Sequence, residues 1–358
     1  MRLLVRACCA ALLGLAAAAP FASEATTNPP AAVQQPAEYQ LPWKSLHMGT
    51  IISGQVYGAS EEEVRRLQAI VENEIERYED LMSVHKETPL NHVNDLAGEW
   101  VDVPEEIAVM TKQALEVAKD SDQAFEPTIG PVVNLWKIGF GGDAVPSEEA
   151  IAKAVSLVDY RKVEVRETEN GWQIRIAPGQ SLDMGAIAKG FIGQKLAERL
   201  RAEGAKHALL DLGGNVVTLG EKYPGRPWHV GLQRPDQERN TYFAVVKAAD
   251  VSVITSGAYE RYMEKEGKRY GHILSAKTGQ PVPTDLSSVS IVDADGGRAD
   301  AWCTALFAMG WDKAVAYLTA HPDLHAVLMH ADLKRVFVSA ALQPIVTVTD
   351  DHLDVTIR

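Results

Sequence analysis

The stretch Leu182-Asp-Met-Gly-Ala-Ile-Ala-Lys-Gly190 stands where a strand end opens into a helix. The helix is predicted over Ile187 to Glu203, and a short apolar run, Ala208 to Leu212, follows it. Short β-branched runs and helices continue to interleave, but without the regular strand–helix alternation of a parallel βαβ array. The sequence therefore predicts an α+β fold with a mixed or largely antiparallel sheet and packed helices. The other elements expected in this half are strands Trp172 to Ile176, Val251 to Thr255, Ser287 to Val292, Ala326 to His330 and Arg335 to Ser339, and a helix from Asp300 to His321.

Towards the N-terminus, a strand-like segment from His47 to Tyr57 leads into a helix start. Ser60 is the expected N-cap of this helix, and Glu63 is placed to complete a capping box. A second helix is predicted from Pro104 to about Asp120. Apolar residues at spacings of three and four mark the buried face of the first helix: Val64, Leu67, Val71, Ile75, Tyr78 and Met82.

The first residues are typical of a secretory signal. Arg2 and Arg6 precede an uncharged run, residues 7–19, which is shorter than the roughly 20 residues of a membrane span. We expect cleavage after Ala22, a disordered leader over residues 23–41 and one domain over residues 42–358. The expected location is the periplasm, without a membrane span once the signal is removed.

The composition limits the partners. The formal net charge is -13, which disfavours binding to nucleic acid and anionic lipid. A phosphate-bearing ligand must then be held by local donors or a metal ion. Beyond the signal the only cysteine is Cys303, so no internal disulfide is expected.

The quoted stretch also carries chemistry. Its small residues allow close approach to the backbone, and a helix N-terminus beside Lys189 is suited to a phosphate. Taken alone, the stretch fits a tightly packed helix entry, with Asp183 and Lys189 as a surface ion pair, at least as well.

A second motif runs from Arg298 to Gly310. Asp300 and Thr304 are four residues apart and share one helix face. A carboxylate and a hydroxyl are hard oxygen ligands suited to Mg²⁺. The alternative is that Asp300 is only the helix N-cap and Thr304 a packed neighbour.

A third motif combines Thr255 to Arg261 with Tyr270 to Gly279. Ser256 and Gly257 form a hydroxyl-bearing turn, and His272 ends a strand. The alternative is a simple hairpin at residues 277–279 with a hydrogen-bonded strand histidine.

Taken together and in order, these motifs resemble the ApbE family of FAD:protein FMN transferases. The resemblance spans nearly the whole chain after the leader and implies an ApbE-like, T-fold-related architecture. It rests on Met48 to Thr50, Phe125 to Pro131 with Asn134 to Trp136, Leu182 to Gly190, Gly213 to Asn215, Thr255 to Arg261, His272 to Gly279 and Ala299 to Thr304.

The resemblance implies two sets of site residues. The FAD-binding positions it implies are Met48, His85, Ala124, Phe125, Glu126, Asp183, Lys189 and Leu274. The Mg²⁺ ligands it implies are the backbone carbonyl of Ala186 and the side chains of Asp300 and Thr304.

The sequence departs from the family pattern at four points. Cys303 stands where many members have an aspartate, and His85 where an aromatic ring commonly stacks on the flavin. Glu126 replaces the more frequent aspartate, and residues 275–276 are Ser-Ala in place of Asp-Pro.

The implied reaction transfers FMN from FAD to a Thr or Ser hydroxyl of an acceptor protein and releases AMP. Phosphoryl transfer depends mainly on positioning and charge neutralisation. Lys189 is a candidate second cationic group, and His272 is a candidate base, with a structural or adenine-contacting role as its alternative. The acceptor implied is an exported electron-transfer subunit. The alternative functions are FAD hydrolysis by water, as a pyrophosphatase, and FAD binding without catalysis.

Overall fold

The computed structural model describes residues 38–358, except residue 85 and residues 258–261. The expected signal over residues 1–22, the leader up to residue 37 and the candidate flavin contact His85 lie outside the described residues. The same holds for residues 258–261 of the third motif.

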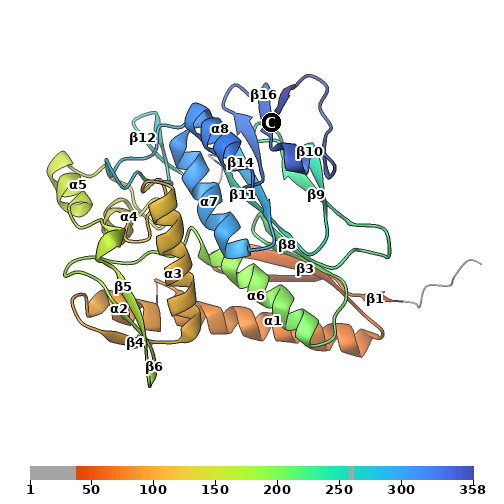
Figure 1. The fold of residues 1–358 in the computed structure, drawn as a ribbon, viewed down its shortest axis with the longest axis horizontal. Coiled ribbons are helices and arrows are strands. Elements are labelled where there is room, and N and C mark those ends of the chain that lie inside the picture. Colours follow the sequence, from red (N-terminus) through yellow and green to blue (C-terminus); the bar gives the residue numbers. More distant parts are fainter. Residues whose placement is uncertain (1–37, 85, 258–261) are drawn as a thin grey trace, which may run out of the picture. The chain divides into compact units, whose positions relative to one another are not determined.

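A large sheet dominates the fold (Figure 1), and it has ten strands within the described part of the chain. All neighbouring strands are antiparallel except β16 and β18, which are parallel. This confirms the predicted fold class. In spatial order the strands are β1 (Tyr39–Gln40), β3 (Thr50–Gly58), β7 (Ala208–Leu212), β8 (Asn215–Leu219), β11 (Ser252–Gly257), β14 (Leu286–Asp293), β15 (Ala326–His330), β16 (Arg335–Val338) and β18 (Asp354–Ile357), with β2 (Trp43–His47) also paired to β3.

Both faces of this sheet are buried. Successive residues of a strand point to opposite faces, and alternate residues belong to two different cores. Ile254 and Ile291 belong to the core beneath the helices, whereas their neighbours Val253 and Val292 belong to a second core. The second core is covered by a three-stranded sheet of β9 (Trp228–Gln233), β10 (Tyr242–Ala248) and β17 (Val346–Val348). The large sheet is therefore the middle layer.

Helices form the layer on the first face. Figure 1 shows α6 (Ala188–Ala202) and α7 (Gly296–Met309) side by side across the sheet, and α1 (Glu61–Met82) packs on β3. The buried side chains of α1 are the six predicted from its sequence. Ser60 caps α1 by accepting the Glu63 N–H at 3.2 Å, and the Glu63 carboxylate accepts the N–H of Ala59.

The remaining elements lie around this frame. A second small sheet contains β4 (Val101–Val103), β6 (Gly171–Arg175) and β5 (Glu164–Thr168), and a hairpin is formed by β12 (Tyr262–Lys265) and β13 (Lys268–Gly271). The other α-helices are α2 (Pro89–Asp95), α3 (Glu105–Asp120), α4 (Gly130–Trp136), α5 (Glu148–Val155) and α8 (Trp311–Ala320).

Three expectations were wrong in detail. The single helix expected from Asp300 to His321 is two helices, separated at Gly310, whose φ of 77° is incompatible with a continuous helix. The strand expected from His47 to Tyr57 is interrupted at its start by the turn of the β2–β3 hairpin. Two residues assigned to the leader, Tyr39 and Gln40, pair with β3, because the edge of the sheet extends to them.

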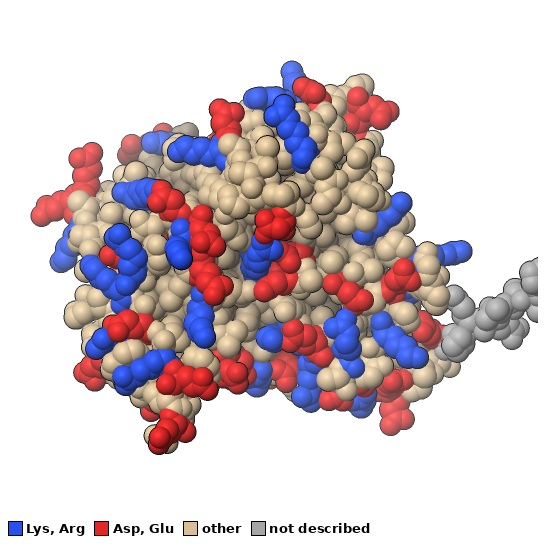
Figure 2. Space-filling model, viewed as in Figure 1, with Lys and Arg blue, Asp and Glu red and all other residues tan. Residues whose placement is uncertain are grey.

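Within the described residues, no helix combines the length and apolarity needed to cross a membrane. On the face shown in Figure 2, Lys and Arg side chains are interspersed with Asp and Glu rather than gathered into one basic area.

Candidate active site

The first turns of α6 and α7 touch through glycine. A Cβ added to Gly190 would lie 2.0 Å from the carbonyl oxygen of Gly296, and one added to Gly296 would lie 2.3 Å from that of Gly190. This approach is possible only without side chains at either position. It places Asp300, in the second turn of α7, against the start of α6, where its Oδ2 accepts the N–H of Gly190 at 2.8 Å.

This contact leaves one backbone carbonyl unused. In a regular helix the N–H of residue 190 would donate to the carbonyl of residue 186. The bonds from Ala188 to Met184 at 2.8 Å and from Phe191 to Ile187 at 3.1 Å form, whereas among the described residues neither Lys189 nor Gly190 donates to the carbonyl four residues before it. Within the described part of the chain, the Ala186 carbonyl accepts no hydrogen bond. The first turn of α6 therefore offers an unused carbonyl oxygen at the level where the buried carboxylate of Asp300 binds.

Asp300 is not the N-cap of its helix, so that alternative is wrong. Asp295 caps α7 by accepting the N–H of Arg298 at 2.9 Å. Thr304 follows Asp300 by one turn and is partly exposed. The carboxylate and hydroxyl expected on one helix face are thus both on α7, clear of its cap.

Cys303 points away from that face, towards the sheet. Its thiol donates to the Val289 carbonyl at 2.9 Å and accepts the N–H of Ser256 at 3.2 Å. The side chain is fully buried, and burial raises the pKa of Cys303 to about 12. The thiol is therefore buried and neutral, and its hydrogen-bond partners lie on strands β14 and β11.

The strand register brings the glycine motifs together at one end of neighbouring strands in the sheet. Ile52, close to the start of β3, pairs with Leu212 at the end of β7, and Asn215, which begins β8, pairs with Ile254 of β11. A Cβ on Gly213 would lie 2.3 Å from the hydroxyl oxygen of Thr50, so the two turns are in contact. The Met48 to Thr50, Gly213 to Asn215 and Ser256 segments are therefore neighbours.

Asn215 adds an unsatisfied hydrogen-bond donor at the same end of these strands. The residue is 1% exposed, and its amide nitrogen has no hydrogen-bond partner among the described residues. A buried donor without a partner is costly, so it marks a place where a ligand atom or water binds. Asn215 belongs to the Gly213 to Asn215 motif, within which the sequence alone indicates no role for its side chain.

The segment around Glu126 is hydrogen-bonded to the start of the Leu182 to Gly190 stretch. Asp183 donates its N–H to the Pro127 carbonyl at 2.8 Å, and the Asp183 carboxylate accepts the N–H of Gly185 at 2.8 Å. Glu126 is buried, and its carboxylate already accepts the N–H and hydroxyl of Thr128 and the N–H of Tyr160. Its side chain is thus engaged in holding the loop. Ala124 and Phe125 precede it, partly and fully buried respectively.

The segment with His272 lies against the same loops. Trp136 donates its indole N–H to the Gly279 carbonyl at 2.7 Å, and Lys277 pairs with Asp122 at 2.6 Å. His272 is partly buried just after β13, and Leu274 is buried. The segments at residues 122–136 and 272–279 are therefore in contact with each other.

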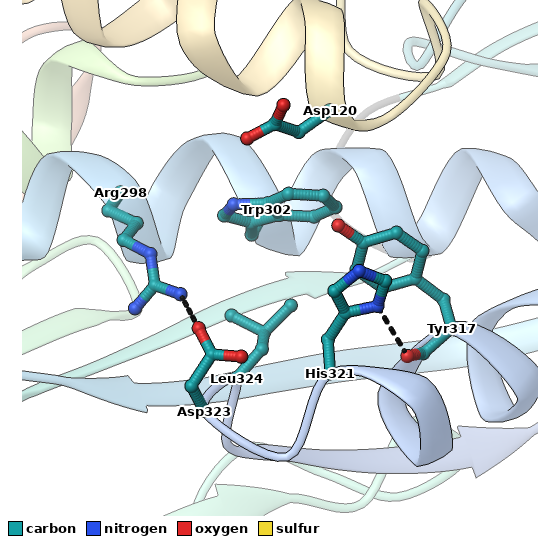
Figure 3. A pocket seen from close by; sticks show the side chains of 7 residues that line it. All are labelled: Asp120, Arg298, Trp302, Tyr317, His321, Asp323 and Leu324. Carbon is teal, nitrogen blue, oxygen red and sulfur yellow. Dashed lines mark hydrogen bonds and ion pairs between the residues drawn. The ribbon is translucent and has the colours of Figure 1, made fainter.

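A separate cavity lies beside another face of α7 (Figure 3). Its volume is about 310 Å³, and none of the predicted site residues that the structure describes lines it. Arg298 in its wall is bound by Asp293 and Asp323. The cavity is distinct from the candidate site, whose residues face the start of α6.

Comparisons with known proteins agree with this geometry. The ApbE family model matches residues 48–328. An FAD:protein FMN transferase of Treponema pallidum is 36% identical over 322 residues, covering 85% of this chain and 88% of the relative. One of Klebsiella pneumoniae is 35% identical over 289 residues, covering 80% and 88%.

Solved structures agree as well. The ApbE protein of Thermotoga maritima superposes with a TM-score of 0.75 at 28% identity, covering 86% of this chain and 99% of that protein. The flavin transferase ApbE of Vibrio cholerae gives a TM-score of 0.75 at 25% identity, covering 86% and 100%. The fold and the site thus define a flavin transferase architecture. The chain belongs to the ApbE family.

Proposed function

We propose that the chain is a magnesium-dependent FAD:protein FMN transferase that moves FMN from FAD to a Thr or Ser hydroxyl of an acceptor protein. The observation that carries the proposal is the bond from Gly190 to Asp300, because it joins a buried carboxylate to a helix start whose Ala186 carbonyl is unused. Family membership supports the same activity.

The donor set fits Mg²⁺. The Ala186 carbonyl, the Asp300 carboxylate and the Thr304 hydroxyl are all hard oxygen ligands, and Mg²⁺ completes its shell with water and phosphate oxygens. No cluster of three His, Cys, Asp or Glu side chains suited to a metal occurs among the described residues. Transition metals that prefer nitrogen or sulfur are therefore disfavoured here. When bound, the ion supplies charge neutralisation on the pyrophosphate.

The chain's own residues supply positioning. Lys189 lies in the first turn of α6, where its ammonium and its own backbone N–H, which has no acceptor among the described residues, attract a phosphate against the negative charge of the whole protein. Asn215 offers its buried amide nitrogen to an oxygen of the donor. Met48, Ala124, Phe125, Asp183 and Leu274 are proposed to enclose the flavin donor, and His85 is proposed to stack on it.

The reaction balances without a further reagent. The acceptor hydroxyl oxygen forms a bond to the phosphorus of the FMN half, and the bond from that phosphorus to the bridging oxygen breaks. AMP leaves with this oxygen. The hydroxyl proton passes to His272, which we propose as the base, since a histidine accepts protons near neutral pH.

The acceptor and the location complete the proposal. The signal-like residues 1–22 support export to the periplasm, and the acceptor is then an exported electron-transfer subunit.

The test uses the chain without residues 1–22, together with FAD, Mg²⁺ and a candidate acceptor. Covalent flavin is read as in-gel fluorescence of the acceptor, and AMP is measured in parallel. We expect both signals to depend on Mg²⁺, and we expect the first to disappear when the acceptor hydroxyl residue is replaced by alanine. AMP release without acceptor would instead support an FAD pyrophosphatase. FAD binding without either product would support a binding protein.

A further inference from the structure

The β2–β3 hairpin turns on two residues in the left-handed conformation. His47 pairs with Thr50, and between them Met48 and Gly49 have φ values of 51° and 66°. Glycine adopts this conformation freely, whereas a methionine is disfavoured there by its Cβ. Such a backbone persists only where the surroundings hold it.

Glu79 holds it. Its Oε1 accepts the N–H of Met48 at 2.6 Å, from the last turns of α1. The bond is charge-assisted, because the acceptor is a carboxylate, and it binds the turn residue directly.

Glu79 is itself fixed by a row of side chains. His47 Nδ1 lies 3.2 Å from Glu79 Oε2, and His47 Nε2 lies 2.7 Å from Glu72 Oε2. The other oxygen of Glu72 accepts the indole N–H of Trp43 at 2.5 Å. Glu72 and Glu79 are seven residues apart and therefore share one face of α1.

The row requires a protonated histidine. A neutral imidazole has one N–H, whereas both ring nitrogens of His47 face carboxylates. Burial opposes the charge, but the hydrogen bonds and charges of Glu79 and Glu72 outweigh it and raise the pKa of His47. Among the described residues, Glu72 and Glu79 are the charged groups in contact with this ring.

We infer that Glu79 is a positioning residue for the flavin donor, acting with protonated His47 to set the place of the Met48 turn. The inference rests on the proposed function, in which Met48 contacts FAD. Thr50, which follows the turn, lies against Gly213, so the hairpin tip contacts both α1 and the glycine turn of the site.

Two variants of Glu79 separate positioning from folding. Glu79→Ala removes the acceptor for the Met48 N–H, and we expect the Kd for FAD to rise about tenfold with kcat within about twofold. Glu79→Gln keeps an oxygen for Met48 and offers its amide N–H to a neutral His47. We expect Glu79→Gln to bind FAD close to wild type.

The pH dependence is a second readout. In the wild type, the Kd for FAD is expected to rise as pH increases through the raised pKa of His47, because the imidazole then loses one of its two donors. Glu79→Gln is expected to show no such rise, since its contact with His47 does not need the second proton.

Glu63 supplies the matched control. It lies on the same helix, and its carboxylate likewise accepts a backbone N–H, that of Ala59 at 2.7 Å, but at the opposite end of α1. Glu63→Ala should leave the Kd for FAD unchanged. An equal loss in Glu63→Ala and Glu79→Ala would contradict the inference and indicate general destabilisation.

The remaining outcomes are distinct. Unchanged FAD binding in folded Glu79→Ala would overturn the positioning role while leaving the proposed function intact. A wild-type protein that binds no FAD would overturn the proposed function, and the positioning role with it. Thermal unfolding of each variant confirms that the protein measured is folded.

Discussion

The Asp300 carboxylate accepts the N–H of Gly190 at 2.8 Å, across 110 residues of sequence. The bond replaces a helical one, so Asp300 has two effects that must be separated. It satisfies a buried backbone donor, and it supplies negative charge for the proposed metal ion. The choice of substitution decides which effect is measured.

Asp300→Asn is expected to abolish transfer while preserving the fold. The asparagine oxygen still accepts the Gly190 N–H, but the charge is lost. Transfer should fall by at least about 100-fold, because several kcal/mol of charge stabilisation are removed. Flavin transfer at several Mg²⁺ concentrations and thermal unfolding together check this. Full magnesium-dependent activity in the variant would show that the metal assignment is wrong.

Gly190→Ala is expected to destabilise the protein by roughly 1–3 kcal/mol or more, because its Cβ would meet the backbone of Gly296. Gly193→Ala, one turn later on α6, is the control. Its Cβ would lie 2.6 Å from a side-chain methyl group of buried Val217 rather than from backbone, so its loss of stability should be smaller. Denaturant unfolding measures both variants. Equal losses would mean that the α6–α7 contact is less rigid than its geometry indicates.

Cys303→Asp is expected to lower the free energy of unfolding by about 3 kcal/mol or more, since it buries a carboxylate facing the carbonyl oxygens of Val289 and Ile254. Cys303→Ser, which keeps a donor and an acceptor, should be much milder. The wild-type thiol should react with a thiol reagent only after unfolding. Stronger Mg²⁺ binding by a stable Cys303→Asp protein would show that position 303 reaches the metal.

The raised pKa of His47 predicts how the free energy of unfolding varies with pH. Its pKa is raised above the ordinary 6.5 in the folded state, so its contribution is fully present below that value. The contribution is lost as pH rises through the folded-state pKa. The difference in unfolding free energy between wild type and His47→Gln should therefore shrink as pH rises above about 6.5 and through the raised folded-state pKa. A difference that grows over this range would contradict a protonated His47.

Local sequence determined much of the fold. The spacing of Val64, Leu67 and Val71 identified the buried face of α1, because that face depends on residues within one helix. Strands β7 and β15 were predicted with their observed bounds for the same reason. The break between α7 and α8 was missed, since Gly310 resembles an ordinary helical glycine until its φ is known.

The site divides in the same way. Asp300 and Thr304 were found from their spacing on one helix. Ala186 as a metal ligand, and Met48 and the other flavin positions, were found from the family resemblance. Glu79 was missed, because its link to Met48 joins residues 31 positions apart and a surface-type glutamate gives no local signal. The only available hint was the pair of acids on the otherwise buried side of α1, next to a histidine-bearing hairpin. The orientation of Cys303 likewise depends on how α7 packs on β11 and β14, which the sequence of the helix does not reveal.

The glycine contact between α6 and α7 also bears on the order of assembly. Gly190 is synthesised long before Gly296 and Asp300, so a nascent chain that ends before α7 has the proposed phosphate-binding helix start but lacks the carboxylate beside it. In such a chain the Gly190 N–H is free to bond the Ala186 carbonyl as in any helix. The docking of α7 exchanges that bond, and a chain truncated before α7 lacks the proposed metal ligands Asp300 and Thr304.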